Sequence, residues 1–245
     1  LVNQDLFNNF INDISILNKL GFIPIIIHGG GKRISIKLNE AGIKNNFING
    51  LRVTDEKSIH IVEEVLNIFN KEITDALKNN GCDSQGITNK QNNILVVKQE
   101  NQKLGFVGAP KEINQYIIEQ IVKKKKVPVI APLGLNEKNQ VFNINADTAA
   151  GSIAKKLNAR RLIIMSDVEG VLDNNKKLIS EINTDKINEL IKNETISGGM
   201  IPKIKNCLDV ASNGVKGVCI IDGRLDHSIL FELLSNAGSG TLIRE

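Results

Sequence analysis

Apolar residues follow two alternating patterns along this chain of 245 residues. Near the start they recur every three or four positions, which predicts an amphipathic helix that Gly21 ends; they are Leu6, Phe10, Ile14, Leu17 and Leu20. The next run, Ile23 to Ile27, is short and continuous, as in a buried strand. The pattern predicts further helices at 32–39, 55–79, 111–124, 147–157, 184–193, 200–212 and 227–235. Strands are expected at 94–98, 104–107, 127–131, 140–143, 161–165, 217–221 and 240–243, the first two as a hairpin-like insertion. This alternation is typical of an α/β fold, a three-layer αβα sandwich with a mostly parallel central sheet.

Composition and charge narrow the function only a little. The chain has 31 basic and 27 acidic residues, a net charge of +4 and 41% apolar residues, which is the balance of a globular protein. One large α/β domain is as compatible with this length as two small ones. The run Lys123–Lys126 is typical of a solvated helix end, so we expect no nucleic-acid partner. The longest apolar runs are too short to span a bilayer and no signal peptide is evident, so we expect no membrane partner and a cytoplasmic location.

The cysteines and histidines give no sign of a metal site. Neither set has the spacing of a ligand group or a disulfide framework; the residues are Cys82, Cys207, Cys219, His28, His60 and His227. We therefore expect reduced thiols and no metal bound by protein side chains.

A glycine-rich turn follows the first predicted strand. His28-Gly29-Gly30-Gly31 connects that strand to a helix, so backbone N–H groups and a helix N-terminus can approach an anion closely. The spacing of later residues excludes both the dinucleotide fingerprint, since the next glycine is Gly42, and the P-loop, since Arg33 follows Lys32. The turn therefore indicates a phosphate or carboxylate cradle, with a tight turn that needs no ligand as the alternative. His28 alone is more often a packed turn residue than a catalyst.

Two polar segments come where other predicted strands end. Asn143, Asn145 and Asp147 gather at one such end, where ligands of open α/β sheets bind, although Asp147 could simply cap the next helix. The segment 163–172 is a buried strand that breaks into a polar turn with a glycine, and a bare turn explains it as well as a site does.

Two cations stand out by position. Lys203 follows Ser197-Gly198-Gly199 and lies about one turn into a predicted helix, where a cation is unfavourable unless an anion is bound beside it. Arg52 precedes a helix cap and could bind a carboxylate with its planar guanidinium, or it could simply be solvated.

Taken in order, these segments resemble the acetylglutamate kinases of the amino acid kinase family, from the first helix to Thr241. The similar segments are His28–Gly31, Asn49–Asp55, Asn143–Ala150, Ser166–Asp173 and Ile196–Lys203. The resemblance implies the amino acid kinase fold over 1–245, with acetylglutamate bound by about 1–145 and ATP by about 146–245. It implies transfer of a phosphoryl group from ATP, with Mg²⁺, to the γ-carboxylate of N-acetyl-L-glutamate, giving N-acetyl-L-glutamyl 5-phosphate in the second step of arginine biosynthesis.

The resemblance also implies a role for each matching residue. Gly30 and Gly31 would donate N–H groups near the transferred phosphoryl group, and Arg52 and Asn143 would hold the substrate. Lys203 would neutralise the phosphates and Asp147 would orient catalytic lysines. The implied ATP-binding residues are Asp167, Val168, Glu169, Gly170, Val171, Leu172, Thr195, Ile196 and Ser197. The C-terminal stretch is similar to the arginine-inhibited, hexameric branch of the family, which implies a homodimer or hexamer and an L-arginine site at His227, Glu232 and Gly238.

The chain departs from the family pattern in three places, one of which is Lys32, at a position where a proline is common. The opening strand of the family, which carries a lysine near two glycines, would precede Leu1, so the printed chain is expected to fold poorly or be inactive without upstream residues. Asn89 and Gln91 replace a glycine and an acid beside Lys90, which puts that turn in doubt. The alternatives to the kinase are a kinase for a carrier-linked amino acid and a non-catalytic regulatory module that binds arginine or a nucleotide.

Overall fold

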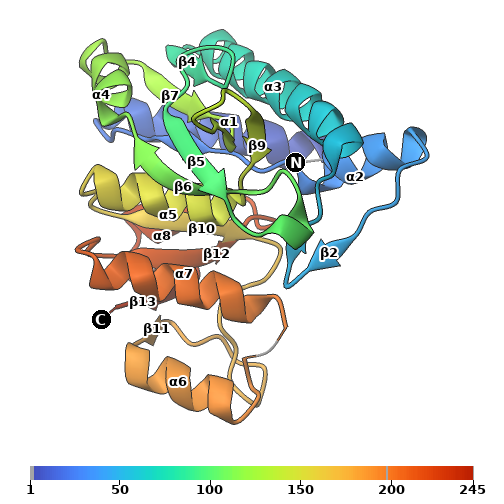
Figure 1. Ribbon diagram of the computed structural model, residues 1–245. Helices are drawn as coiled ribbons and strands as arrows, with labels where there is room; N and C mark the ends of the chain where they lie inside the picture. Colours follow the sequence, from blue (N-terminus) through green and yellow to red (C-terminus); the bar gives the residue numbers. More distant parts are fainter. Residues whose placement is uncertain (1–2, 197, 245) are drawn as a thin grey trace. The chain divides into compact units, whose positions relative to one another are not determined.

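The computed structural model describes residues 3–196 and 198–244, which divide into two compact units, 1–149 and 150–245 (Figure 1). The boundary falls inside a helix, α5 (Ala146–Lys156). Both units combine helices with parallel strand pairs, which confirms the predicted α/β class. Within the described residues, no helix is both long enough and apolar enough to cross a membrane.

Two helices of the first unit begin at polar side-chain caps, and two of its helices meet in an apolar core. They are α1 (Gln4–Lys19), α2 (Gly31–Glu40), α3 (Glu56–Asn79) and α4 (Gln115–Lys123). Asn3 Oδ1 accepts from the backbone N–H of Asp5 and Leu6 at the start of α1, and Asp55 Oδ1 accepts from that of Ser58 at the start of α3. The buried core that joins α2 and α3 consists of Ile34, Leu38, Val62, Leu66, Ala131 and Leu133. This core holds the first turn of α2 against α3.

The strands of the first unit form three sheets. The order β1-β7-β4 is parallel throughout, and β7, its central strand, is buried at every residue. A second sheet has the order β6-β5-β8-β9, and β2 and β3 form a hairpin. Asn49 (φ 50°) and Gly50 (φ 80°) make its turn, in the left-handed conformation that two-residue hairpins need. The bounds are β1 (Ile26–Ile27), β2 (Phe47–Ile48), β3 (Leu51–Arg52), β4 (Ser84–Ile87), β5 (Leu95–Gln99), β6 (Gly108–Ile113), β7 (Val127–Ile130), β8 (Leu133–Leu135) and β9 (Val141–Asn143), with a 3₁₀ turn at Gln102–Leu104.

The second unit is built around the sheet β10-β12-β13-β11. Strands β10 and β12 are parallel, β13 is antiparallel to β12, and β12 is buried at every residue because α7 and α8 pack against it. Gly151 of α5 allows close packing on α7, since a Cβ there would lie 2.8 Å from Val210 Cγ2. The bounds are β10 (Leu162–Ser166), β11 (Glu181–Ile182), α6 (Thr184–Lys192), α7 (Met200–Ser212), β12 (Val218–Asp222), α8 (Ser228–Leu234) and β13 (Thr241–Ile243).

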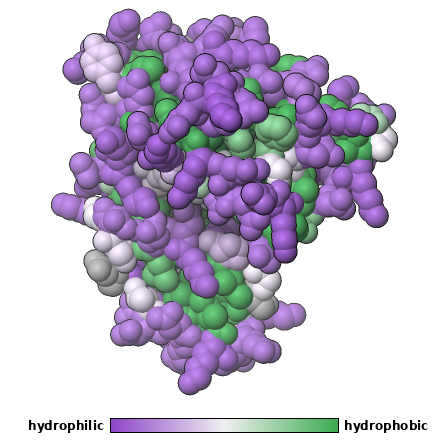
Figure 2. All heavy atoms as spheres, in the orientation of Figure 1, coloured by the Kyte–Doolittle hydropathy of each residue, from purple (hydrophilic) through white to green (hydrophobic). Residues whose placement is uncertain are grey.

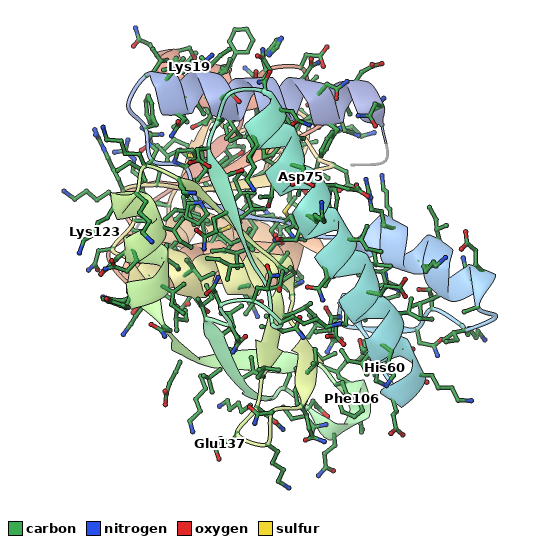
Figure 3. The ribbon with its side chains drawn as sticks, turned by 90° about the horizontal axis from the view of Figure 1, so that it is seen from above. Lys19, His60, Asp75, Phe106, Lys123 and Glu137 are labelled. Carbon is green, nitrogen blue, oxygen red and sulfur yellow. The ribbon has the colours of Figure 1, made fainter. Side chains whose placement is uncertain are left out.

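Several charged side chains lie at the surface. Polar residues cover most of the face in Figure 2. Figure 3 shows Lys19 and Lys123 at the ends of α1 and α4 and Glu137 in the β8–β9 turn, with their side chains at the periphery. The exposed lysines after α4 precede the buried strand β7, which confirms the prediction of a solvated helix end.

Three predicted elements differ from the observed ones by more than two residues at one end. The strand predicted at 23–27 is reduced to Ile26–Ile27, because Pro24 has no N–H to donate and Ile23 is 65% exposed. The second hairpin strand is not 104–107 but β6, which pairs with β5 from Gly108 to Ile113. The helix predicted at 111–124 therefore begins only at Gln115.

Candidate active site

The turn between β1 and α2 presents backbone donors. The His28 N–H donates to the Ile130 carbonyl on β7, and Ile34 donates to the Gly30 carbonyl to begin α2. Among the hydrogen bonds of the described residues, the N–H groups of Gly29, Gly30 and Gly31 have no acceptor. A Cβ at Gly30 would lie 2.7 Å from Leu66 Cδ2, whereas a Cβ at Gly31 would meet nothing within 4 Å. Packing therefore requires glycine at position 30, and position 31 faces open space.

An open depression of about 620 Å³ lies beside this turn. The first turns of α2 and the hairpin β2–β3 form its walls, and its lining residues are Gly31, Lys32, Ser35, Ile36, Phe47 and Arg52. Phe47 is 55% exposed, so the depression combines apolar surface with backbone donors and cations.

Arg52 is the charged group buried at this depression, with 8% of the residue exposed. Its Nη2 donates to the Gly31 carbonyl at 3.0 Å and to Ser35 Oγ at 2.9 Å, and its Nη1 donates to Asn45 Oδ1. The guanidinium also lies over the Phe47 ring, 4.7 Å from its centroid. Within 3–196 and 198–244 no carboxylate pairs with it, and burial lowers its pKa below the ordinary value. A buried cation with neutral partners is well suited to bind an anionic ligand.

Two hydrogen bonds through Thr54 connect Asn143, on β9, to the backbone of Arg52. Its Nδ2 donates to Thr54 Oγ1 at 3.4 Å, and Thr54 Oγ1 donates to the Arg52 carbonyl at 3.1 Å. A backbone β-bridge also joins Thr54 to Gly105. A Cβ at Gly105 would lie 2.3 Å from the Thr54 carbonyl oxygen. The structure therefore brings Gly31, Arg52 and Asn143 into one connected region of the first unit.

The cap of α5 is Asn145 rather than Asp147. Asn145 Oδ1 accepts from the Thr148 N–H at 3.0 Å, whereas Asp147 lies in the first turn of the helix. The capping role that the sequence allows for Asp147 is thus wrong by two residues. Its carboxylate lies at the positive end of the helix dipole.

The doubtful turn at Asn89 is built from neighbouring side chains. Thr88 Oγ1 accepts from the N–H groups of Lys90 and Gln91, and Asn89 Nδ2 donates to Glu63 on α3 at 2.8 Å. Lys90 pairs with the same carboxylate at 3.4 Å. The carboxylate of Glu63 on α3 therefore pairs with Lys90, as the acid within the turn would do in the family pattern.

In the second unit, the turn after β10 has an exposed half and a buried half. Asp167 and Glu169 are exposed. Gly170 (φ 142°) and Val171 are buried: the Val171 N–H donates to Thr241 Oγ1 at 2.8 Å, and a Cβ at Gly170 would lie 2.6 Å from that oxygen. Gly170 and Val171 therefore fasten the turn to β13, while Asp167, Val168 and Glu169 form its accessible part and Leu172 is half-buried.

An ion pair that the motifs did not reveal lies beside this turn. Asp222, at the end of β12, is 2% exposed and accepts from the Arg224 N–H, Nε and Nη2 at 2.9, 2.8 and 2.7 Å. The bonds from Arg224 hold the pKa of Asp222 below its usual value. The Gly223 N–H donates to the Ser166 carbonyl, so this pair lies at the same sheet edge as the turn after β10. The only signal in the sequence was a short polar Asp-Gly-Arg segment after a buried strand.

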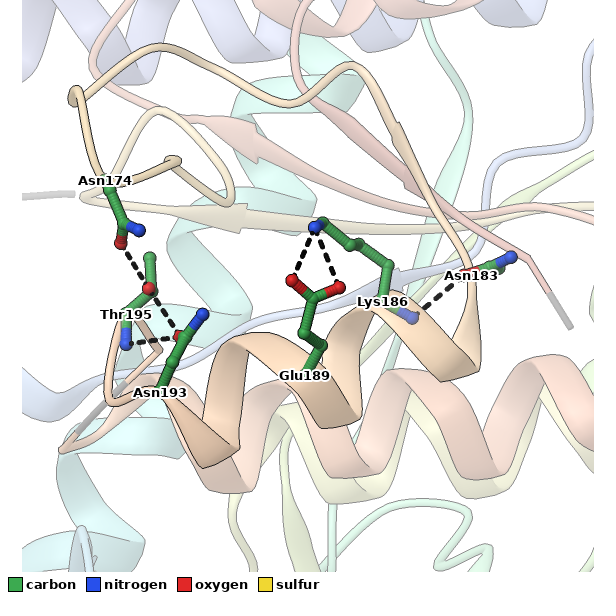
Figure 4. Close-up of polar contacts among 6 residues, drawn as sticks. All are labelled: Asn174, Asn183, Lys186, Glu189, Asn193 and Thr195. Carbon is green, nitrogen blue, oxygen red and sulfur yellow. Dashed lines mark hydrogen bonds and ion pairs between the residues drawn. The ribbon is translucent and has the colours of Figure 1, made fainter.

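The remaining nucleotide-site candidates lie around α6 and α7. Figure 4 shows Thr195 between Asn174 and Asn193, and its hydroxyl is within hydrogen-bond distance of the Oδ1 atoms of both. Ile196 is buried, and Ser197 lies outside the described residues. Lys203 is half-buried in the first turns of α7, whose N-cap residue, Gly199, provides no side-chain cap.

Two of the three residues proposed for arginine lie together. Glu232 is buried, its Oε2 accepts from the Ser239 N–H at 2.8 Å, and a Cβ at Gly238 (φ 70°) would lie 2.9 Å from that oxygen. Arg161 Nη1 lies 3.6 Å from Glu232 Oε1. His227 precedes α8 in the left-handed conformation and is exposed.

Comparisons with known proteins identify relatives of this chain. The model of the amino acid kinase family matches residues 1–222. The acetylglutamate kinase of Pelagibacter ubique is 67% identical over 100% of this chain and 85% of its own length. That of Campylobacter hominis is 47% identical over 97% of this chain and 84% of its own length. Among solved structures, smu.665 from Streptococcus mutans has a TM-score of 0.84 at 30% identity, with 96% of this chain and 91% of that chain covered. Carbamate kinase from Giardia lamblia, at 16% identity and a TM-score of 0.71 over 96% and 89% of the two chains, shares the fold.

The chain therefore belongs to the amino acid kinase family. Within that family it groups with the acetylglutamate kinases, the enzymes named at 67% and 47% identity. The resemblance found in five sequence segments is thus confirmed.

Proposed function

We propose that this protein transfers the γ-phosphoryl group of ATP to the γ-carboxylate of N-acetyl-L-glutamate, producing N-acetyl-L-glutamyl 5-phosphate for arginine biosynthesis in the cytoplasm. Its similarity to acetylglutamate kinases supports the reaction. The observation that carries the substrate is Arg52, a buried guanidinium with neutral partners beside an open depression.

Arg52 binds a carboxylate of the acetylated amino acid. Three of its N–H protons are already used by Gly31, Ser35 and Asn45, which fix the orientation of the guanidinium before substrate binds. The exposed Phe47 ring offers apolar surface next to this cation, which suits the acetyl group. Asn143 holds the substrate from β9, one hydrogen bond away from the Arg52 strand. The unit 1–149 therefore binds N-acetyl-L-glutamate.

The backbone donors of the glycine turn act on the transferred phosphoryl group. The N–H groups of Gly30 and Gly31 and the dipole of α2 stabilise negative charge as it spreads over the phosphoryl oxygens. Lys203 neutralises phosphate charge and Asp147 orients the catalytic cations. The unit 150–245 binds ATP with Asp167 to Leu172 and Thr195 to Ser197.

Mg²⁺ accompanies ATP. No group of three His, Cys, Asp or Glu side chains that could hold a metal ion occurs among the described residues. This fits a metal that takes most of its ligands from nucleotide phosphates and water, as Mg²⁺ commonly does. The ion would supply neutralisation of phosphate charge when bound.

L-arginine inhibits the enzyme through Glu232 and Gly238, with His227 at the start of the same helix. Glu232 supplies a buried carboxylate for a guanidinium, and Arg161 already lies beside it. A related fold, the N-acetylglutamate synthase of Neisseria gonorrhoeae, has been solved with L-arginine. The enzyme works as a homodimer or hexamer. An arginine titration of activity without effect at about millimolar concentration would reject the inhibitor site, and light scattering with and without arginine would give the assembly.

Hydroxylamine trapping of the acyl phosphate tests the reaction. The enzyme, with ATP, Mg²⁺ and N-acetyl-L-glutamate, is expected to form the hydroxamate, and Lys203→Ala is expected to abolish it. Arg52→Met should raise the KM for N-acetyl-L-glutamate about 10- to 150-fold, the value of one hydrogen bond to a charged group, with little change in the KM for ATP. Arg160→Met, at an exposed arginine of the second unit, is the matched control and should behave like the unaltered enzyme.

The result that contradicts the proposal is ATP binding without product. It would leave a non-catalytic nucleotide-binding relative as the better description. Turnover of a carrier-linked glutamate in place of the free acetylated one would instead favour a carrier-dependent kinase.

A further inference from the structure

His28 takes part in a fully defined hydrogen-bond network behind the glycine turn. It is 6% exposed, and its Nδ1 lies 2.9 Å from the Gly29 carbonyl oxygen. Its Nε2 lies 3.2 Å from Asn70 Nδ2 on α3. Asn70 Nδ2 also donates to the Val129 carbonyl on β7 at 2.9 Å. The network thus connects the turn, α3 and the central strand of the parallel sheet.

The hydrogen-bond partners allow only one placement of the protons on His28 and on the Asn70 amide. A carbonyl oxygen can only accept, so Val129 requires the amide nitrogen of Asn70 on its side, and Gly29 requires a proton on His28 Nδ1. The same Asn70 nitrogen then faces Nε2 and donates to it, so Nε2 carries no proton. His28 is therefore a neutral imidazole in the Nδ1–H form. Burial, which lowers the pKa of His28 to about 4, keeps it neutral at physiological pH.

Packing around the imidazole allows little freedom. The Phe69 ring meets it edge to face at 5.2 Å between centroids, and the guanidinium of Arg33 lies over the Phe69 ring, 4.1 Å from its centroid. On β4, a Cβ at Gly86 would lie 2.4 Å from Asn70 Oδ1, so the glycine leaves room for the Asn70 side chain. Each of these contacts fixes the ring or its partner in one orientation.

The hydrogen bond to Gly29 has a consequence for the next residue. The Gly29 carbonyl and the Gly30 N–H belong to one planar trans peptide and point in opposite directions. Holding the carbonyl inward toward His28 therefore directs the Gly30 N–H outward. That N–H has no acceptor among the described residues, and it is the donor that the proposed function assigns to the phosphoryl group.

We infer that His28 is a positioning residue: by donating from Nδ1 to the Gly29 carbonyl, it aims the Gly30 N–H at the transferred phosphoryl group. This inference rests on the proposed function for the role of Gly30, whereas the network itself does not. His28 neither touches the substrate nor transfers a proton. Its effect is on the transition state, where preorganised N–H donors matter most.

Two substitutions separate the hydrogen bond from the packing. The amide nitrogen of asparagine is one bond from Cγ, as Nδ1 is in histidine, so His28→Asn keeps a donor for Gly29, whereas His28→Leu keeps only the apolar volume. We expect His28→Leu to lower kcat about tenfold or more, less than the loss of a whole oxyanion donor, with the KM for both substrates within about twofold. His28→Asn should retain kcat within about threefold of the unaltered enzyme.

A spectroscopic measurement on the unaltered enzyme needs neither a variant nor substrate. Long-range ¹H–¹⁵N spectra of protein labelled in its three histidines should show one imidazole that does not titrate between about pH 5.5 and 8 and carries its proton on Nδ1. His60 and His227 are exposed, and their signals serve as references. A proton on Nε2, an unchanged kcat in folded His28→Leu, or an equal loss in His28→Asn and His28→Leu overturns the inference. If His28→Leu does not fold, the tautomer and His28→Asn still decide. Absence of kinase activity in the unaltered enzyme would reject the proposed function and leave the tautomer result standing.

Discussion

Adjacent glycines with opposite surroundings give the sharpest test of the glycine turn. Gly31 is the first residue of α2, and a methyl group there meets nothing within 4 Å. Gly31→Ala should therefore fold, and it should stabilise the protein by about 0.5 kcal/mol because alanine has less freedom to lose in the unfolded chain. The same methyl group occupies the depression where substrate is expected. Loss of one backbone hydrogen bond to a charged oxygen, about 1.5–3 kcal/mol, lowers kcat/KM about 10- to 150-fold.

Gly30→Ala is the matched comparison. Its Cβ would lie 2.7 Å from Leu66 Cδ2, and Leu66 is 1% exposed, so the core must give way at a cost of about 1–3 kcal/mol. Urea unfolding at one fixed protein concentration and the hydroxylamine assay measure both quantities for both variants. We expect Gly31→Ala to be stable and weakly active, and Gly30→Ala to lose both properties. A Gly31→Ala enzyme with unchanged kcat/KM, or one less stable than Gly30→Ala, would refute the reasoning.

Three further predictions concern stability. The pKa of His28 is 6.5 in the unfolded chain and about 4 in the folded protein, so protonation of His28 favours unfolding as the pH falls between these values, by up to about 3 kcal/mol. His28→Asn does not titrate in this range. The free energy of unfolding of the unaltered protein, minus that of His28→Asn, should therefore decrease as the pH falls from 6.5 to about 4. Thr241→Val leaves two buried backbone groups without the hydroxyl and should cost about 3 kcal/mol, whereas Thr74→Val, whose hydroxyl donates to a carbonyl inside α3, should cost under about 1 kcal/mol in the same denaturant series. Gly105→Ala meets the Thr54 carbonyl oxygen at 2.3 Å and should lower the melting temperature much further than Gly42→Ala, which has a similar φ and open surroundings.

Local periodicity predicts where the helices lie but does not predict several of the strands. Of the apolar residues whose spacing predicts α1, Ile14 and Leu17 are buried in the core, whereas Leu20 is 58% exposed. Of the two cap residues that the sequence allows for α3, Thr54 and Asp55, the cap is Asp55. Strand β4 reads Ser-Gln-Gly-Ile, which has almost no apolar signal, and it pairs because it lies beside the buried β7. Ser84 is buried there with its hydroxyl bonded to the Thr74 carbonyl, a partner that no local pattern reveals.

The candidate site shows the same division. Glycines in a strand-to-helix turn are a local signal, because backbone geometry and the helix dipole come from neighbouring residues. Contacts between residues distant in sequence give no local signal. Asp222 can be recognised only from the structure, in which the end of β12 lies beside Ser166, and Asn70 is 42 residues from His28. The tautomer of His28, and with it the direction of the Gly30 N–H, depends on those distant partners.

Arg52 illustrates why burial decides function where composition cannot. In the sequence it is one of 31 basic residues, and a solvated arginine there would have needed no explanation. The hairpin β2–β3 turns it onto α2, where Gly31, Ser35 and Asn45 use part of its donor capacity but none of them carries a negative charge. Desolvating a cation without a counter-ion is unfavourable, so a fold that does so has lower stability until an anion binds. We therefore propose that the free energy that a ligand carboxylate would recover at Arg52 contributes to affinity, and that this side chain, rather than the more exposed lysines, selects an acid as substrate.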